Sequence, residues 1–172
     1  GEAMLARLRE IDPEAAASIH PNNTKRVLRA LEVFFATGKT LTQQNAQSKL
    51  NKSPFHFVLL ALTCRRDILY DRINRRVDGM VEQGLFEEVQ SLLKRGVPAN
   101  SQSMQGIGYK EAVQFLNGAV TREACIEKIK QNSRNYAKRQ LTWFRRGDYQ
   151  WFDAVSPGLY ESVKQYIGEH SL

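Results

Sequence analysis

The sequence has few cysteines and no long apolar segment. Cys64 and Cys125 are far apart and form no CxxC pair, which predicts neither a disulfide framework nor a zinc site and favours a reducing cytoplasm. No stretch approaches the ~20 apolar residues of a membrane-spanning helix. A charged segment followed by an apolar one, as in a secretion signal, does not open the chain either. We therefore expect a cytoplasmic protein with no membrane partner.

Several enzyme motifs are missing from the 172 residues as well. The sequence contains no GxxxxGK[ST] loop, HExxH, GxSxG, or HxE followed by CxxC. His20, His56 and His170 have no metal-ligand spacing, so no metal site is predicted. We expect His20, which precedes Pro21, to be a structural or hydrogen-bonding residue.

What the chain has is positive charge, concentrated near its C-terminal end. Lys and Arg number 25 against 18 Asp and Glu, for a net charge of +7. Residues 121–146 contain eight Lys or Arg and two Glu, which accounts for nearly all of that excess. A polyanionic partner is therefore favoured: nucleic acid, a phosphorylated metabolite or an acidic membrane surface.

The basic segment is expected to form one long helix with two different stripes. Its polar stripe consists of Gln131, Arg134, Lys138, Thr142 and Arg145. Its apolar stripe consists of Ile126, Ile129, Tyr136, Ala137 and Phe144. The polar stripe fits a phosphate backbone, with Tyr136 and Trp143 as stacking surfaces. The alternative is a solvated face with the aromatic residues in the core.

Two more predicted helices carry basic residues on one side, and this repetition favours a nucleic-acid partner. The residues are Lys25, Arg26 and Arg29 in the helix expected over 24–37, and Arg72, Arg75 and Arg76 in the helix expected from Asp67 to about Gln83. Arg presents a fork of donors that matches phosphate oxygens, so Arg72 and Arg76 are candidates for binding a phosphate or diphosphate. Ion pairing with Asp71 or Asp78 is the alternative.

The remaining pattern predicts a mostly helical protein with a few strands. Helices are expected over 3–9, 13–19, 24–37, part of 40–54, 67–83, 85–94, 106–116 and 121–146, and after Gly158. The apolar run from Phe55 to Thr63 does not alternate, which is typical of a strand covered on both faces in a parallel sheet; residues 149–153 suggest a second, short strand. Gly106 to Gly108 precede a helix, where their N–H groups could face an anion or form a simple turn.

Four segments in this order resemble the tRNA dimethylallyltransferase family: Ile19–Thr42, Arg72–Val89, Ile107–Glu111 and Tyr136–Arg145. The resemblance implies the C-terminal part of a P-loop kinase-like α/β core over residues 54–172, and part of an inserted helical domain over residues 1–53. It also implies a Mg²⁺-dependent transfer of a dimethylallyl group from dimethylallyl diphosphate to N6 of the adenine on the 3′ side of the anticodon. The target base would be flipped into a channel. We expect a monomer.

The same resemblance assigns roles to individual residues. Arg76 is implied as a catalytic residue that stabilises the leaving diphosphate, together with Arg72. The residues implied to contact tRNA are Lys25, Arg26, Val27, Leu28, Arg29, Gln105, Gly106, Ile107, Gly108, Tyr109, Lys110, Arg134, Lys138, Arg139, Gln140, Thr142, Trp143 and Arg145.

Other family features have no counterpart in these residues. They are the P-loop, the aspartate implied to act as base on N6, the threonine and glycines of the channel, and the ligands of Mg²⁺. We expect them upstream of Gly1, which also is not a Met, so the sequence suggests a fragment that binds tRNA weakly and transfers nothing alone. The tail lacks the zinc finger of eukaryotic members, which suggests a bacterial type.

Two other functions stay open at this point. The chain could be a non-catalytic helical module that grips structured RNA through its backbone and shape. It could instead be a relative of nucleotide kinases in which Arg72 and Arg76 act on phosphoryl transfer, although the QLTWFR segment argues against that interpretation.

Overall fold

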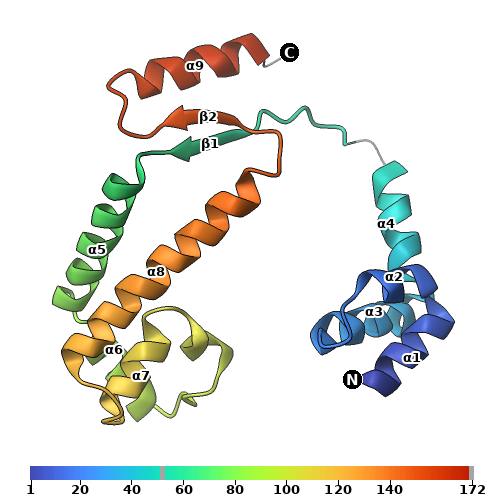
Figure 1. The fold of residues 1–172 in the computed structure, drawn as a ribbon, viewed down its shortest axis with the longest axis horizontal. Helices are drawn as coiled ribbons and strands as arrows, with labels where there is room; N and C mark the ends of the chain where they lie inside the picture. The colour runs from blue at the N-terminus through green and yellow to red at the C-terminus, as the bar shows by residue number, and fades with distance from the viewer. Residues whose placement is uncertain (51–52, 171–172) are drawn as a thin grey trace. The chain divides into compact units, whose positions relative to one another are not determined.

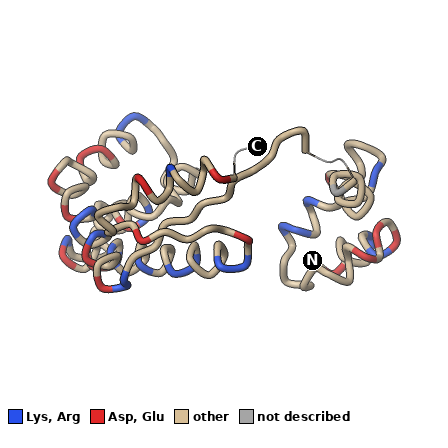
Figure 2. Tube along the Cα trace, turned by 90° about the horizontal axis from the view of Figure 1, so that it is seen from above, with Lys and Arg blue, Asp and Glu red and all other residues tan. Residues whose placement is uncertain are grey.

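The structure is a computed structural model that describes residues 1–50 and 53–170. It divides into two compact units, Gly1–His56 and Phe57–Leu172, and Lys and Arg residues occur in both (Figure 2). The described residues are mostly helical with one small sheet (Figure 1). The prediction of a mostly helical protein with a few strands is therefore confirmed.

The first unit packs its helices around a small aliphatic core. Its helices are α1 (Glu2–Ile11), α2 (Pro13–Ser18), α3 (Thr24–Thr37) and α4 (Leu41–Leu50). The expected helix ends are confirmed for α3, because Asn23 caps its start and Gly38 ends it with φ +70°. The buried residues are Leu5, Leu8, Ala16, Ile19, Val27, Ala30 and Leu31. The part of the predicted connector at 51–52 lies outside the described residues.

Two large apolar side chains of α3 lie outside the core. Leu28 and Phe35 are 47% and 66% exposed, while Val33 is buried. Helical periodicity gives the direction of each side chain but not how far the packed neighbours extend around the helix. The side of α3 that carries Lys25 and Arg29 therefore also carries two exposed apolar side chains.

Asp12 links two helices of this unit. It is 4% exposed; Oδ1 accepts from the Ala15 N–H (3.2 Å) and the Thr42 hydroxyl (2.7 Å), and Oδ2 accepts from the Thr42 N–H (3.0 Å). Burial alone would raise the pKa of this carboxyl, but the hydrogen bonds from Thr42 and Ala15 outweigh it, and the pKa lies below the usual 3.8. The ionised form is therefore the one that holds α2 against α4.

We expect Asp12 to make the first unit sensitive to acid. Because its pKa is lower in the folded chain, its stabilisation is complete above about pH 3.8 and is lost as the pH falls through the folded value. Asp12→Asn should lower the free energy of unfolding at pH 7 by on the order of 2 kcal/mol and flatten this acid dependence. Urea unfolding followed by circular dichroism at pH 7, 4 and 3 measures both effects. Glu14→Gln, an exposed change in the same helix, is the control, and parallel acid curves for Asp12→Asn and the unmodified chain would contradict the expectation.

The second unit is a helical cluster attached to a two-stranded sheet (Figure 1). Its elements are β1 (Leu60–Thr63), α5 (Arg66–Glu82), α6 (Leu85–Lys94), the 3₁₀ helix η1 (Gln102–Gln105), α7 (Tyr109–Leu116), α8 (Arg122–Phe144), β2 (Gln150–Asp153) and α9 (Leu159–His170). Helices α5, α6, α7 and α8 enclose the main core, with Val77, Phe86, Val89, Met104 and Ile129 among its buried residues. This core supports one half of α8, while the other half runs toward β2.

The sheet is smaller than the sequence predicts. Strands β1 and β2 are parallel, in register from Leu60 opposite Gln150 to Thr63 opposite Asp153. Residues 55–59, expected as part of the first strand, form no strand, and Phe55 and Phe57 are 71% and 64% exposed. Strand length depends on backbone pairing, and an apolar run alone does not show where a partner strand ends.

The start of α5 also differs from the expectation. The helix was expected to begin at Asp67, but it begins at Arg66, with Arg65 as the N-cap and Asp67 in the first turn. There the Asp67 carboxylate accepts two hydrogen bonds from the Arg65 guanidinium, at 3.2 and 2.7 Å. An acidic residue is favourable anywhere in the first turn of a helix, so its presence did not fix the position of the cap.

Candidate nucleic-acid interface

A groove between α5 and α8 unites residues that the sequence singled out separately. It has a volume of about 770 Å³, and we call it the α5–α8 groove. Its polar lining includes Arg76 from α5, Gln105 from η1, and Arg139 and Gln140 from α8, and its apolar floor includes Ile73, Val77, Met80 and Ile129. The groove thus combines two arginines with an apolar floor, an arrangement suited to an anion joined to an apolar group.

Arg76 and Arg72 are free to bind an anion. Asp71 pairs with Arg75, and Asp78 pairs with Lys130 at 2.7 Å; the hydrogen bond from this pair raises the pKa of Lys130 although burial opposes it. Within residues 1–50 and 53–170, neither Arg72 nor Arg76 takes part in an ion pair. The alternative of pairing with Asp71 or Asp78 is therefore wrong for both arginines.

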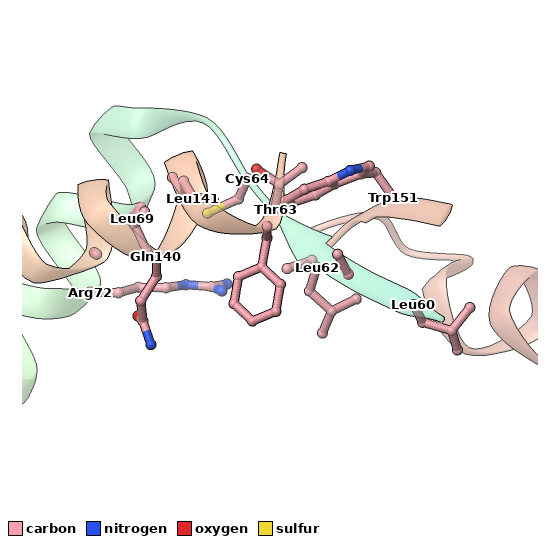
Figure 3. A pocket seen from close by; sticks show the side chains of 13 residues that line it. Leu60, Leu62, Thr63, Cys64, Leu69, Arg72, Gln140, Leu141 and Trp151 are labelled. Carbon is pink, nitrogen blue, oxygen red and sulfur yellow. The ribbon is translucent and has the colours of Figure 1, made fainter. Parts of the chain in front are cut away.

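Arg72 lines a second cavity next to the groove. This cavity, of about 390 Å³, is mostly apolar and extends from β1 to Trp151 and the end of α8. Figure 3 shows the side chains of Arg72 and Gln140 lying close together at one end of it, away from Leu60. Gln140 lines both cavities, so Arg72 and Arg76 approach neighbouring spaces from the same side of α5.

The segment from Gly106 to Lys110 is held by a buried carboxylate that the sequence reasoning missed. Glu111 is 5% exposed; it accepts from the Gly108 N–H at 2.8 Å and from the Asn132 amide at 2.7 Å. Gly108 has φ +100° and is the N-cap of α7, a conformation that favours glycine. The spacing of Gly108 and Glu111 is that of a capping box, and this spacing could have predicted the role of Glu111 from the sequence.

These contacts correct the role expected for Gly108. The Gly108 N–H donates to Glu111, so it does not face an anion, as the glycine pattern suggested. Tyr109 is half-buried, and its hydrogen bond with Glu88 raises the pKa of the Tyr109 hydroxyl. Gln105, Gly106, Ile107 and Lys110 are exposed, and the first three line the α5–α8 groove.

We expect Glu111→Ala to destabilise the second unit and to loosen the groove. The change leaves the buried Gly108 N–H and the Asn132 amide without their acceptor, which should cost about 3 kcal/mol in total. Chemical unfolding measures the loss, and hydrogen exchange at residues 105–110 measures the loosening. Glu82→Ala, an exposed change on α5, should stay within about 0.5 kcal/mol. Equal effects of the two changes would show that Glu111 does not hold this segment.

The residues of the polar stripe of α8 differ in their exposure to solvent. Arg134 is half-buried and donates to the side-chain oxygen Oδ1 of Asn74 at 2.6 Å, so it joins α8 to α5 and is less open to solvent than expected. Tyr136, expected on the apolar stripe, is 49% exposed, with the Arg139 guanidinium 5.8 Å from its ring. Trp143 is 62% exposed, which excludes the alternative that it lies in the core.

The other predicted contacts of α8 reach solvent. Lys138, Arg139, Thr142 and Arg145 are exposed, as is Gln140. A shallow depression of about 550 Å³ on the outer side of α8 includes Lys138, Arg139, Thr142 and Trp143. Cations beside an exposed aromatic ring are a common surface for binding a nucleic-acid strand. The residues on this side of α8 therefore stay candidates for contacting tRNA.

In the first unit, five residues of α3 were predicted to contact tRNA, and three of them are cations. Lys25, Arg26 and Arg29 are exposed, and Arg29 lies 3.5 Å from Glu32. Val27 was predicted as a contact but is fully buried in the core of the unit, because it lies on the opposite side of the helix. Its part is to hold α3 in place.

Metal chemistry finds no support in these cavities. Mg²⁺ prefers oxygen ligands, above all carboxylates, and neither the α5–α8 groove nor the cavity beside Arg72 has an Asp or Glu in its lining. No group of three or more His, Cys, Asp or Glu that could hold a metal occurs in the part of the chain that the structure describes. We therefore assign none of the described residues to Mg²⁺.

His20 accepts a hydrogen bond from the Asn22 N–H at 3.2 Å, as its predicted hydrogen-bonding role requires.

Comparisons with known proteins agree on one family. Residues 1–147 match the family described as IPP transferase. The chain is 54% identical over 153 residues to the tRNA dimethylallyltransferase of Halalkalibacterium halodurans, covering 88% of this chain and 48% of that protein. Among the helices of residues 1–50 and 53–170, none combines the length and apolar character needed to cross a membrane.

Solved structures resemble the chain along nearly its whole length. The full-length tRNA isopentenylpyrophosphate transferase of Bacillus halodurans matches with a TM-score of 0.62 and 46% identity over 99% of this chain and 54% of that one. A eukaryotic dimethylallyltransferase acting on tRNA matches with a TM-score of 0.72 and 29% identity over 95% of this chain and 44% of that one. The chain thus spans about half the length of the proteins it matches.

Proposed function

Because the chain belongs to the IPP transferase family, we propose that it is part of an enzyme that transfers a dimethylallyl group to tRNA. The acceptor would be N6 of the adenine on the 3′ side of the anticodon, and the donor dimethylallyl diphosphate. In this reaction the bond between C1 of the prenyl group and the diphosphate oxygen breaks, its electron pair stays on the diphosphate, and N6 bonds to C1 and loses a proton. We propose that the enzyme acts as a monomer.

The observation that carries this proposal is the composition of the α5–α8 groove. Among residues 1–50 and 53–170, Arg76 has no carboxylate partner, and it lines the groove beside an apolar floor. This suits a group with a diphosphate at one end and five carbons at the other. A guanidinium fixed where charge develops on the leaving oxygen favours the transition state over the ground state. We assign Arg76 this catalytic role, and Arg72 the binding of the same diphosphate from the neighbouring cavity.

In the second unit, the tRNA would lie along exposed surfaces next to the groove. We propose that it contacts Gln105, Gly106 and Ile107 at the rim, and that these segments guide the flipped adenine toward Arg76. Further proposed contacts are Lys110, Lys138, Arg139, Gln140, Thr142, Trp143 and Arg145 in the second unit, and Lys25, Arg26, Leu28 and Arg29 in the first. We propose that residues 1–53 are part of the helical insertion and residues 54–172 part of the P-loop kinase-like core.

Mg²⁺ is expected to accompany the diphosphate, since it screens phosphate charge in many transfer enzymes. The proton on N6 also needs a base, and the α5–α8 groove has no carboxylate. The resemblance gives both tasks to residues without a counterpart in this sequence. The proposal for this chain is therefore limited to holding the diphosphate and the tRNA.

A prenyl-transfer assay on a full-length protein that contains these residues tests the proposal. Mass spectrometry of the tRNA should reveal a dimethylallyl group on the adenine beside the anticodon, and that product should be absent when dimethylallyl diphosphate is omitted. Tight tRNA binding without transfer would favour the alternative, a non-catalytic RNA-binding module. Tight binding of mononucleotides without binding of tRNA would favour a nucleotide kinase relative.

A further inference from the structure

A third cavity of the second unit is strongly basic and lies at the C-terminal end of β1. It has a volume of about 320 Å³, and its polar lining comes from Thr63, Arg66, Tyr70, Lys138, Thr142 and Arg145. Three of these side chains are cations, and the lining has no carboxylate. Arg66 and Tyr70 belong to α5 and have no role in the proposed reaction. We call this space the β1–α8 cavity.

The positive charge of this cavity is not neutralised by the chain itself. The nearest acidic residue in sequence, Asp67, is held by the Arg65 guanidinium through two hydrogen bonds. No ion pair of Arg66, Lys138 or Arg145 occurs among residues 1–50 and 53–170. Three cations around one small space repel one another, and an anion placed between them removes that repulsion.

The geometry also orients the donors. The Arg66 guanidinium lies over the Tyr70 ring, 4.9 Å from its centroid, and such stacking fixes the plane of the guanidinium while its edge can still donate to oxygens. The Thr142 hydroxyl already donates to the Lys138 carbonyl at 2.9 Å, so Tyr70 and Thr63 are the hydroxyl donors left. The cavity also opens where β1 leads into the 17-residue helix α5, and ends of parallel strands are common ligand sites.

We propose that the β1–α8 cavity binds a phosphodiester group of the tRNA backbone, with Arg66 and Tyr70 as contacts on α5. This inference rests on the proposed function and adds a subsite to it. A backbone phosphate suits the cavity because Lys138, Thr142 and Arg145, already proposed to contact tRNA, form its other wall. The leaving diphosphate is placed elsewhere, since Arg72 and Arg76 line the two other cavities.

The first test compares Arg66→Ala with Arg65→Ala in a full-length protein that contains these residues. Both changes remove one positive charge from adjacent exposed positions, but only Arg66 lines the cavity. Arg66→Ala should weaken tRNA binding five- to tenfold, and should reduce the slope of log K against log salt by about 0.9, the value for one lost phosphate contact. Arg65→Ala should change affinity less than twofold. Arg66→Lys, which keeps the charge but loses the planar fork, should fall between them.

The second test needs no substitution and uses Cys64 as a reporter. Cys64 is half-buried in the wall of the β1–α8 cavity, whereas Cys125 is 1% exposed. Cys64 also lines the cavity of Arg72, so inorganic diphosphate is kept at a saturating concentration throughout. The rate of alkylation at Cys64, followed by mass spectrometry of its peptide, should then fall several-fold further when tRNA is added. An unchanged rate on addition of tRNA would contradict the proposal.

The outcomes separate this inference from the function on which it rests. If the unmodified protein modifies tRNA, but Arg66→Ala matches Arg65→Ala and tRNA leaves the Cys64 rate unchanged, the subsite is wrong and the function stands. If the unmodified protein neither binds nor modifies tRNA, the proposed function itself is wrong and the subsite falls with it.

Discussion

Arg76→Ala is expected to lower kcat/KM for dimethylallyl transfer by about 10²- to 10³-fold in a full-length protein that contains these residues. Loss of one preorganised donor from a charged transition state has an effect of that size. Arg76 lines the α5–α8 groove and has no carboxylate partner in the part of the chain that the structure describes, so its charge should be available to the diphosphate. Single-turnover assays at saturating tRNA measure the chemical step, and tRNA affinity should change less than threefold.

Arg75→Ala is the matched control for this prediction. Arg75 is the adjacent residue on α5, is exposed, and pairs with Asp71; its loss should change the rate less than twofold. Arg76→Lys should recover part of the rate, because an ammonium keeps the charge but not the paired donors. A rate for Arg76→Ala within threefold of the unmodified enzyme would remove Arg76 from the reaction centre.

The 172-residue chain by itself is expected to transfer no dimethylallyl group at all. The sequence has no GxxxxGK[ST] loop, and the α5–α8 groove has no carboxylate to accept the proton of N6. Without a base and a full set of phosphate ligands, the groove supplies only part of the transition-state stabilisation. Incubation of the chain with tRNA, Mg²⁺ and dimethylallyl diphosphate, followed by mass spectrometry, should leave the tRNA unmodified.

Weak tRNA binding by the isolated chain should nevertheless be measurable. Exposed cations such as Lys138, Arg139 and Arg145 give electrostatic binding that weakens steeply between 50 and 200 mM salt, roughly as expected for several phosphate contacts. A full-length tRNA dimethylallyltransferase assayed on the same tRNA is the positive control. Turnover by the isolated chain would contradict the prediction and would require a base within these residues.

Local signals in the sequence predicted the helices well. Helix α3 begins after Asn23 and ends before Gly38, and Gly84 precedes α6 with φ +96°. Such ends can be predicted because capping and positive φ depend on a few neighbouring residues. Arg76, Gln105 and Arg139, which the family resemblance implied as site residues, line one groove in the structure. Their roles in binding stay proposals.

Features that depend on distant partners could not be predicted in the same way. The partial burial of Arg134 follows from Asn74, 60 positions away, and the contact between Asn132 and Glu111 joins residues 21 positions apart on different helices. The exposure of Tyr136 arises because α8 leaves the main core halfway along its length, beyond Ile129. Helical periodicity treats all turns of a helix alike, although the elements packed against the helix change from one end to the other.

The pairing of β1 with β2 has a consequence for the distance between the two arginine-bearing helices. Only two residues separate β1 from α5, and five separate α8 from β2, so the strand register determines how far α8 is advanced along α5. A slip of one residue between the strands would shift that end of α8 by about 3.3 Å. Such a shift is comparable to the length of a hydrogen bond, and it would change the distance between Gln140 and Arg72, which line the same cavity. Four backbone pairs in a small sheet therefore determine how α8 is aligned with α5.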